Sequence, residues 1–155
     1  MLNAQDEFFM HEALLLAKLA AEQGEIPVGA LIVDASKNII AKAHNLRETT
    51  NNAIAHAETL VIQGACAKLG RWRLHDCTLY VTLEPCFMCA GAIVLARNPR
   101  VVFAATDPKA GAVHSLATVL NDSRLNHQCI VHGGLGEQEA SFLLKDFFKA
   151  RRTKT

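Results

Sequence analysis

Two short motifs contain residue types that could hold a metal ion and move protons. They are His56-Ala57-Glu58 and, further along the chain, Pro85-Cys86-Phe87-Met88-Cys89. Cys86 and Cys89 are three residues apart, so on a helix their side chains lie on one face and can reach one ion. Two thiolates and one neutral imidazole balance the charge of Zn²⁺ and suit its softness. We therefore predict a zinc ion held by His56, Cys86 and Cys89.

Three protein ligands leave the fourth position of a tetrahedral zinc open, which is typical of a catalytic site. A water molecule in that position has its pKa lowered from ~15.7 to about 7. Glu58 follows His56 by two residues and on a continuous helix points to a different side, so it is a poor fourth ligand. We predict that Glu58 is the catalytic residue that takes a proton from the water and delivers it to the substrate.

Each motif alone is compatible with a role other than catalysis. A Cys-x-x-Cys pair can be redox-active, structural or part of a packed core, and His-x-Glu is common by chance. Their combination favours catalytic zinc. A structural zinc would need a fourth ligand from Cys66, Cys77, Cys129 or another histidine, and none of these has paired spacing. We expect these three cysteines to be small core residues.

The pattern of apolar residues predicts the elements that must position these motifs. Helices are expected over about residues 3–23, 55–69, 86–97 and 137–152, and strands over 27–33, 39–43, 78–83, 101–105 and 128–132. In the first helix the expected buried stripe consists of Phe8, Phe9, Leu15, Leu16 and Leu19. Helices alternate with strands after the second strand, which indicates crossover connections and a sheet covered on both faces. We predict a three-layer α/β/α fold with a five-stranded mixed sheet.

The predicted helix ends place the two motifs near each other. Pro85 suits the first turn of the third helix, so both cysteines of the second motif lie at a helix N-terminus. Unpaired N–H groups and the positive end of the helix dipole favour thiolate there. His56 lies at the start of the second helix, so two helix N-termini are expected to converge on one point.

The composition is that of one globular domain. The chain has 155 residues and a formal net charge of +1, so any site for a polyanion must be a local patch. Its five cysteines are an odd number, which argues against a disulfide framework. The first ten residues include Asp6 and Glu7 and do not read as a secretory signal, and no apolar run approaches the roughly 20 residues of a membrane span. We expect a single domain over residues 1–155 and a cytoplasmic location.

The last predicted helix combines basic and aromatic side chains. These are Lys145, Phe147, Phe148, Lys149, Arg151, Arg152 and Lys154. Cations bind phosphates and aromatic rings stack on extruded bases, so the helix could be a handle for RNA. Alternatively Phe142, Leu143 and Phe147 pack on the sheet, and the basic end is solvated and compensates the helix dipole.

The two motifs together resemble the signature of the cytidine-deaminase-like zinc fold. Longer segments are similar to the bacterial tRNA-specific adenosine deaminases, over roughly residues 8–152. They are Pro27-Val28-Gly29-Ala30, residues 78–86, Cys89-Ala90-Gly91-Ala92 and residues 146–152. The resemblance implies hydrolytic deamination of adenosine to inosine at the wobble position of a tRNA anticodon. It also implies a homodimer and RNA contact by the tail, with Phe147, Phe148, Arg151 and Arg152 as candidate contacts.

The resemblance also implies binding residues beyond the metal. Asn45 matches an asparagine that contacts the flipped nucleoside, and Asp107 a loop residue near the RNA. Val28 and Gly29 match the strand that walls the base pocket, where a glycine permits close approach of a ligand. Leu83 and Glu84 match a backbone segment near the zinc water. The chain departs from some members at His44, Leu46 and Thr106, which border the expected RNA path.

Two alternatives to tRNA editing stay open at the level of sequence. A small-molecule deaminase of the same fold would act on cytidine, guanine or a deoxynucleotide, and zinc chemistry alone does not exclude it. A non-catalytic, zinc-stabilised RNA-binding module would not need an open coordination position or Glu58.

Overall fold

The computed structural model describes residues 1–153, so Lys154 of the basic tail lies outside the described residues. In chain order the helices and strands are α1 (Ala4–Glu22), β1 (Gly29–Val33), β2 (Ile39–His44), α2 (Ala57–Leu69), β3 (Thr78–Leu83), α3 (Phe87–Leu95), β4 (Arg100–Ala105), β5 (Ile130–Gly133) and α4 (Glu137–Thr153). The predicted elements are all present. The largest differences are of two residues: β1, α2 and β5 begin two residues late, and α3 ends two residues early.

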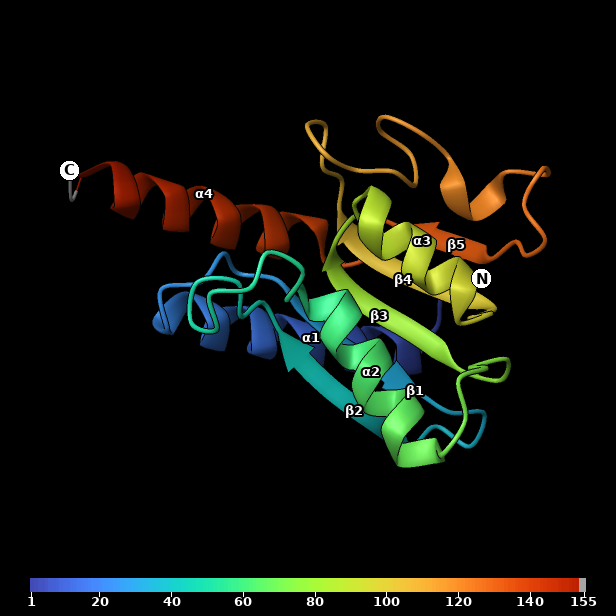
Figure 1. The fold of residues 1–155 in the computed structure, drawn as a ribbon. Coiled ribbons are helices and arrows are strands. Elements are labelled where there is room, and N and C mark those ends of the chain that lie inside the picture. Colours follow the sequence, from blue (N-terminus) through green and yellow to red (C-terminus); the bar gives the residue numbers. More distant parts are fainter. Residues whose placement is uncertain (154–155) are drawn as a thin grey trace.

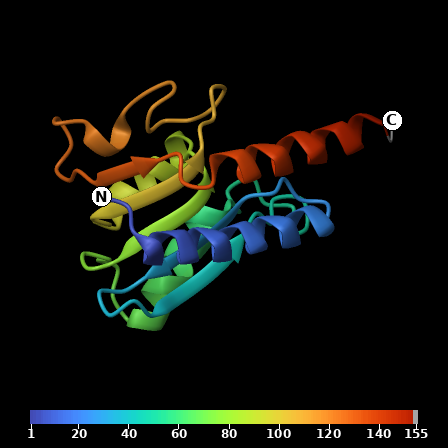
Figure 2. The same cartoon turned by 180° about the vertical axis from the view of Figure 1, so that it is seen from behind.

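The strands form one five-stranded mixed sheet in the order β2-β1-β3-β4-β5. β1 pairs antiparallel with β2 and β3, whereas β3, β4 and β5 are parallel. Helices α2 and α3 cover one face of the sheet, and α1 and α4 cover the other, as the front and back views show (Figures 1 and 2). The prediction of a three-layer α/β/α fold is confirmed.

Alternation along the strands divides the core between the two faces. In β1, Ala30 and Ile32 belong to the cluster under α2 and α3, while Leu31 and Val33 belong to the cluster under α1 and α4. Successive side chains of a strand point to opposite faces, so a strand covered on both sides is apolar throughout. All five residues of β1 are buried, which explains the unbroken apolar run in the sequence.

The predicted apolar stripe of α1 is wrong. Phe8, Leu15 and Leu19 are 56%, 44% and 41% exposed, and of the predicted set Phe9 alone is fully buried. The buried face contains three alanines, Ala13, Ala17 and Ala20, beside the larger Asp6, Phe9, Met10 and Leu14. These alanines let α1 lie so close to the sheet that the larger leucines are turned outward.

Gly29 is the point of closest approach between α1 and the sheet. A Cβ atom built on Gly29 would lie 2.2 Å from the carbonyl oxygen of Ala13 and 2.7 Å from the amide nitrogen of Ala17. Both are backbone atoms, so no side chain can move aside to make room. The glycine therefore accommodates a helix, and the role of Gly29 in admitting a ligand stays a prediction.

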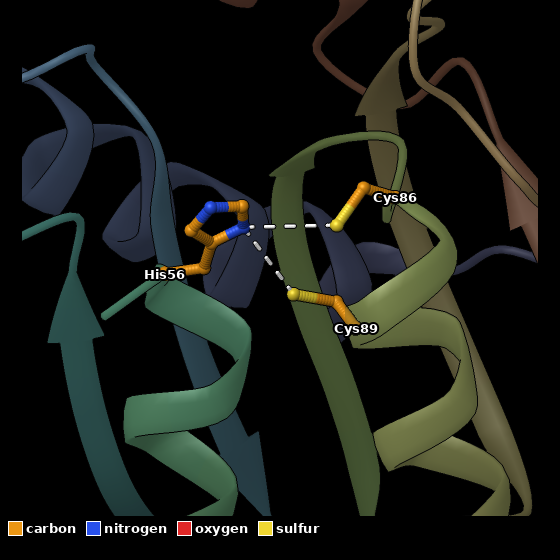
Figure 3. Close-up of side chains that lie close together, drawn as sticks. All are labelled: His56, Cys86 and Cys89. Carbon is orange, nitrogen blue, oxygen red and sulfur yellow. Dashed lines mark hydrogen bonds between the residues drawn. The ribbon is translucent and has the colours of Figure 1, made fainter. Parts of the chain in front are cut away.

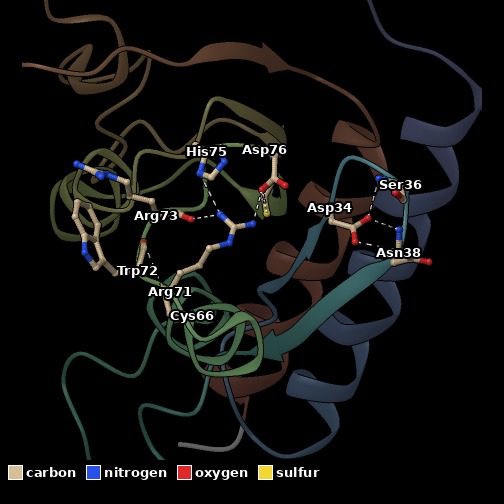
Figure 4. Close-up of polar contacts among 10 residues, drawn as sticks. Asp34, Ser36, Asn38, Cys66, Arg71, Trp72, Arg73, His75 and Asp76 are labelled. Atoms are coloured by element: carbon tan, nitrogen blue, oxygen red, sulfur yellow. Dashed lines mark hydrogen bonds and ion pairs between the residues drawn. The ribbon is translucent and has the colours of Figure 1, made fainter.

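The connection from α2 to β3 is held by Arg71 (Figure 4). Its guanidinium donates to the carbonyl oxygen of Arg73 and to Nδ1 of His75, 3.1 Å away, and forms a 2.7 Å ion pair with Asp76. Gly70 ends α2 in the left-handed conformation that favours glycine. These contacts fix how β3 enters the sheet at the end opposite to the two motifs.

Within residues 1–153, no helix is both long enough and apolar enough to cross a membrane. The five cysteines are all free.

Candidate zinc centre and active site

The two motifs meet where α2 and α3 begin (Figure 3). Nδ1 of His56 lies 3.7 Å from Sγ of Cys86 and 3.6 Å from Sγ of Cys89. In a tetrahedral site with Zn–S of about 2.3 Å and Zn–N of about 2.05 Å, a sulfur and a nitrogen ligand are about 3.6 Å apart. The three ligand atoms all lie within 4.8 Å of one another. The cluster therefore has the spacing and the ligand types of a zinc site.

Both motifs supply the residue that precedes the first turn of a helix. His56 is the N-cap of α2 and Cys86 is the N-cap of α3, and neither side chain caps its own helix. An N-cap residue has an extended backbone, which leaves its side chain free to turn toward the neighbouring helix. The free N–H groups of both helix starts make this place favourable for thiolate. The prediction that two helix N-termini converge on one point is confirmed.

The protonation of the cluster favours a metal. Two hydrogen bonds lower the pKa of Cys86 to about 4: the larger effect comes from Cys89 and the smaller from His56. The contact with Cys86, together with burial, raises the pKa of Cys89, because its proton is held between two sulfur atoms. A cation that replaces this proton binds both sulfur atoms as thiolates, so metal binding should release protons.

Glu58 stands beside this cluster in the first turn of α2. Its side chain is almost fully buried, with a relative exposure of 4%. Burial raises the pKa of its carboxyl to about 7, which is the range in which one group can both accept and donate a proton near neutral pH. The position and this pKa suit the proton carrier that the sequence predicts.

A cavity of about 250 Å³ opens over the cluster. Its lining contains predicted site residues, which are Val28, Asn45, His56, Glu58, Leu83, Glu84, Cys86 and Asp107. It also contains residues that the sequence analysis missed, which are Ile26, Arg47, Ala57 and Ala110. Three of these are one or two residues from a predicted residue along the chain. A search of the sequence within two positions of Val28, Asn45 and Glu58 would therefore have found most of these missed residues.

Asn45 lines the cavity and is held in place by two hydrogen bonds. Its Oδ1 accepts a 3.0 Å hydrogen bond from the amide of Arg47, and its Nδ2 donates to the carbonyl oxygen of Ile26 at 3.4 Å. An amide side chain has two donor hydrogens and two acceptor lone pairs, so one of each is available to a ligand. Asn45 is 7% exposed, and this fixed amide suits recognition of a polar group on a nucleoside.

Buried Glu25 stabilises the loop that follows Asn45. Its carboxylate accepts hydrogen bonds from the amides of Glu48 at 3.0 Å and Thr49 at 2.6 Å. Burial opposes its ionisation, but the hydrogen bonds from Thr49 and Glu48 lower its pKa overall. Nothing in the local sequence indicates this role, because the partners are more than twenty residues away along the chain.

The side chain of Glu84 is not directed at a ligand. Its carboxylate accepts hydrogen bonds from backbone amides of residues 107–115 and from the hydroxyl of Ser115. Burial opposes its ionisation, yet these donors, led by the Ser115 hydroxyl, lower its pKa to about 2. Asp107 lies on the same loop, where its Oδ1 accepts hydrogen bonds from the amides of Lys109 and Ala110.

The aromatic residues of the tail have different environments. Phe147 is 9% exposed, and the guanidinium of Arg151 lies over its ring at 5.0 Å and donates to the carbonyl oxygen of Gly24. The Phe147 ring is therefore covered, as the packing alternative expected, and is not free to stack on a base. Phe148 is 42% exposed, and Phe142, which that alternative would bury, is 65% exposed.

A second groove, of about 350 Å³, separates the tail from the loop that carries Asp107. It is lined by Lys109, Leu144, Lys145, Phe148 and Arg152. Three cations surround one exposed aromatic ring, which is the combination expected of a surface that tracks a nucleic-acid strand. Of the predicted tail contacts, Phe148 and Arg152 line this groove. Phe147 and Arg151 do not.

Comparisons with known proteins agree with this geometry. Residues 3–105 match the family described as the cytidine and deoxycytidylate deaminase zinc-binding region. A tRNA-specific adenosine deaminase of Bacillus subtilis is 54% identical over 150 residues, which is 97% of this chain and 92% of the relative. A solved structure from work on A-to-I editing by tRNA:A34 deaminases at the wobble position of transfer RNA is 43% identical. Its TM-score is 0.85, over 88% of this chain and 99% of that chain.

A guanine deaminase structure from Nitrosomonas europaea has a TM-score of 0.80 over 91% of this chain and 83% of that chain. At 24% identity this likeness extends to the fold alone. The fold and the three-ligand cluster define the class of zinc-dependent deaminases. Within that class, the chain belongs to the family of tRNA-specific adenosine deaminases.

Proposed function

We propose that this protein is an enzyme that hydrolyses adenosine to inosine at the wobble position of a tRNA anticodon. The observation that carries the proposal is one cavity lined by two of the three zinc ligands, His56 and Cys86, together with buried Glu58 and the fixed amide of Asn45. Membership of the tRNA-specific adenosine deaminases supports adenosine in tRNA as the substrate. Zinc is the cofactor, and His56, Cys86 and Cys89 are the residues that would hold it.

The chain's own residues bind the base and move protons. Val28 and Leu83 form apolar walls for the adenine ring, and Asn45 bonds to the nucleoside. Zinc, when bound, lowers the pKa of water to about 7 and so supplies a strong nucleophile at neutral pH. Glu58 accepts a proton from that water and delivers it to N1 of the adenine as the new bond to C6 forms.

Glu58 carries protons in the second half of the reaction as well. The remaining proton of the attacking oxygen passes to the departing amino group, and the bond between C6 and that nitrogen breaks. The products are inosine and ammonia, so the overall reaction consumes one water molecule. A carboxyl with a pKa near 7 can both accept a proton from the water and donate one to the substrate, because its protonated and ionised forms are similarly stable at neutral pH.

The basic groove beside the cavity supports RNA as the substrate. Lys109 lies on the loop that carries Asp107 and Ala110 to the cavity, and the same lysine lines the groove with Phe148 and Arg152. A strand whose base enters the cavity can therefore continue along this groove. We include in the proposal the anticodon stem-loop as the recognised part of the tRNA, a homodimer, a cytoplasmic location and a single domain over residues 1–155.

The double variant Phe148→Ala/Arg152→Ala tests this path and leaves the buried Phe147 in place, although it removes the edge contact between the two rings. We expect weaker binding of an anticodon stem-loop and a shallower dependence of binding on salt, because fewer counterions are released. Zinc content and melting temperature should stay unchanged. Phe142→Ala is the matched control, since that ring is exposed on the same helix but does not line the groove.

The small-molecule alternative makes the opposite prediction for the same variants. If the enzyme deaminates free nucleosides or bases efficiently, and the double variant leaves this activity unchanged, the protein is a small-molecule deaminase of the same fold. Light scattering tests the homodimer separately: a monomeric mass at micromolar concentration would contradict it.

A further inference from the structure

The carboxylate of Glu84 lies at the centre of a network that connects the zinc-ligand turn to the loop over residues 107–115. Glu84 is 2% exposed and stands two residues before Cys86, at the end of β3. Its Oε2 accepts the amides of Val113 at 3.0 Å, His114 at 2.8 Å and Ser115 at 2.9 Å. Three consecutive amides that converge on one oxygen form a concave anion-binding arrangement of the backbone.

The second oxygen of Glu84 holds the other end of the same loop. Its Oε1 accepts the amide of Asp107 at 2.9 Å and the hydroxyl of Ser115 at 2.6 Å. One carboxylate thus accepts five hydrogen bonds, and the loop closes around it. Both oxygens of a carboxylate accept and neither donates, so it can face all of these donors, whereas a neutral amide of the same shape brings a donor of its own.

Further contacts tie the loop to the turn that bears Cys86. Gly111 forms an antiparallel bridge with Cys86, and the amide of Ala112 donates to the carbonyl oxygen of Pro85 at 2.9 Å. A Cβ atom on Gly111 would lie 2.2 Å from Cδ of Glu84, so only glycine lets the loop pass this close to the carboxylate. The loop and the metal turn are therefore packed against each other as one unit.

This loop forms one wall of the substrate cavity. Asp107 and Ala110 line the cavity, and the Asp107 side chain caps the turn between them through the amides of Lys109 and Ala110. Lys109, between them, lines the basic groove. The position of this wall depends on where the Asp107 amide is held.

We propose that Glu84 is a positioning residue that sets the distance between the zinc-ligand turn and the substrate wall formed by Asp107 and Ala110. The inference rests on the proposed function for its substrate. Its role is separate from metal binding, since the carboxylate contacts the loop and none of the three ligands.

Glu84→Gln is the sharpest variant because it preserves shape and removes one acceptor. Its single oxygen can still accept the amides of Val113, His114 and Ser115, but its amino group then faces the Asp107 amide, donor against donor. We expect the Asp107 end of the loop to be released. Misplacement of a binding group by about 1 Å can cost up to 100-fold, so kcat/KM for an anticodon stem-loop should fall about 10- to 100-fold. Most of this loss should appear in KM.

Zinc stoichiometry should stay near one per chain in Glu84→Gln. The effect should also be non-additive with Asp107→Ala, because Glu84 acts through the Asp107 end of the loop. The matched control is Asp6→Asn, which removes another buried carboxylate far from the cavity. It should lower the melting temperature without changing KM.

Amide hydrogen exchange separates this inference from the proposed function, since it needs no substrate. The amide of Asp107 should exchange faster in Glu84→Gln than in the wild-type protein. Ser115→Ala, which removes one donor at an exposed residue, should cause a smaller rise in KM even if Glu84→Gln fails to fold. The proposal is overturned if Glu84→Gln keeps normal KM and exchange, if it loses zinc, or if its effect adds fully to that of Asp107→Ala. An unchanged KM in Ser115→Ala would equally overturn it.

Discussion

Replacing Gly29 with alanine should destabilise the protein by displacing α1 from the sheet. The added Cβ atom would lie 2.2 Å from the carbonyl oxygen of Ala13 and 2.7 Å from the amide of Ala17. Both atoms are backbone, so relief requires a shift of the helix as a whole. Overpacking of this kind costs about 1–3 kcal/mol, and a rigid obstacle favours the upper end of that range.

The expected loss can be read as a change in melting temperature. A chain of 155 residues has an unfolding entropy of about 0.33 kcal/mol/K, so a loss of about 2–3 kcal/mol lowers Tm by about 6–9 °C. Thermal melting followed by circular dichroism measures this directly in zinc-loaded protein. The matched control is Gly91→Ala: a Cβ there meets nothing within 4 Å, and Gly91 lies inside α3. Higher helix propensity should stabilise that variant by about 0.8–1 kcal/mol.

This reasoning would be refuted by a Gly29→Ala variant that has the melting temperature of the wild-type protein but a lower affinity for substrate. That outcome would mean that the glycine serves the ligand and that α1 can move away at little cost.

Three further predictions concern the site and the core. Glu58→Gln should keep zinc and fold but lose about 10²–10⁴-fold in kcat, since the amide cannot carry a proton; near-normal turnover would contradict its role. Cys89→Ala should lose most of its zinc in elemental analysis, and full retention would exclude the predicted ligand set. Burial opposes ionisation of Asp6, but hydrogen bonds from Arg100 and Tyr80 outweigh it and hold the pKa of Asp6 well below its usual range. Its contribution to stability is therefore present above about pH 4 and lost as the pH falls further, so Tm should drop less steeply on acidification in Asp6→Asn than in the wild type.

The zinc centre could be predicted from the sequence because its ligands lie in two short motifs whose residues are close together along the chain. Cys86 and Cys89 share one helix turn, and Pro85 and the strand before it mark where that helix begins. The strands could also be predicted, since β1 is an apolar run and β3 is rich in apolar and β-branched residues, and turn residues bound both. The prediction that His56 lies near the two cysteines needed one assumption. It was that the N-termini of helices on the same face of a sheet lie side by side.

The roles of Gly29, Glu25 and Glu84 could not be predicted in this way. The partners of the two carboxylates lie more than twenty residues away along the chain, and only the folded topology brings them together. The stripe of α1 failed for a related reason: apolarity ranks leucine above alanine, whereas close packing on β1 requires the small residue. The same limit applies to the tail, where the sequence left RNA contact and packing both open for Phe147, and the structure shows that Phe147 is buried and Phe148 exposed.

The most direct test of the proposed function is mass analysis of an anticodon stem-loop with adenosine at the wobble position, after incubation with the zinc-loaded protein. The predicted result is the mass change of replacing one amino group by oxygen, located at the wobble nucleotide by nuclease mapping. Glu58→Gln should form this product at least ~100-fold more slowly, and free adenosine should be a poor substrate. An unmodified stem-loop, together with rapid deamination of a free base or nucleoside, would contradict tRNA editing.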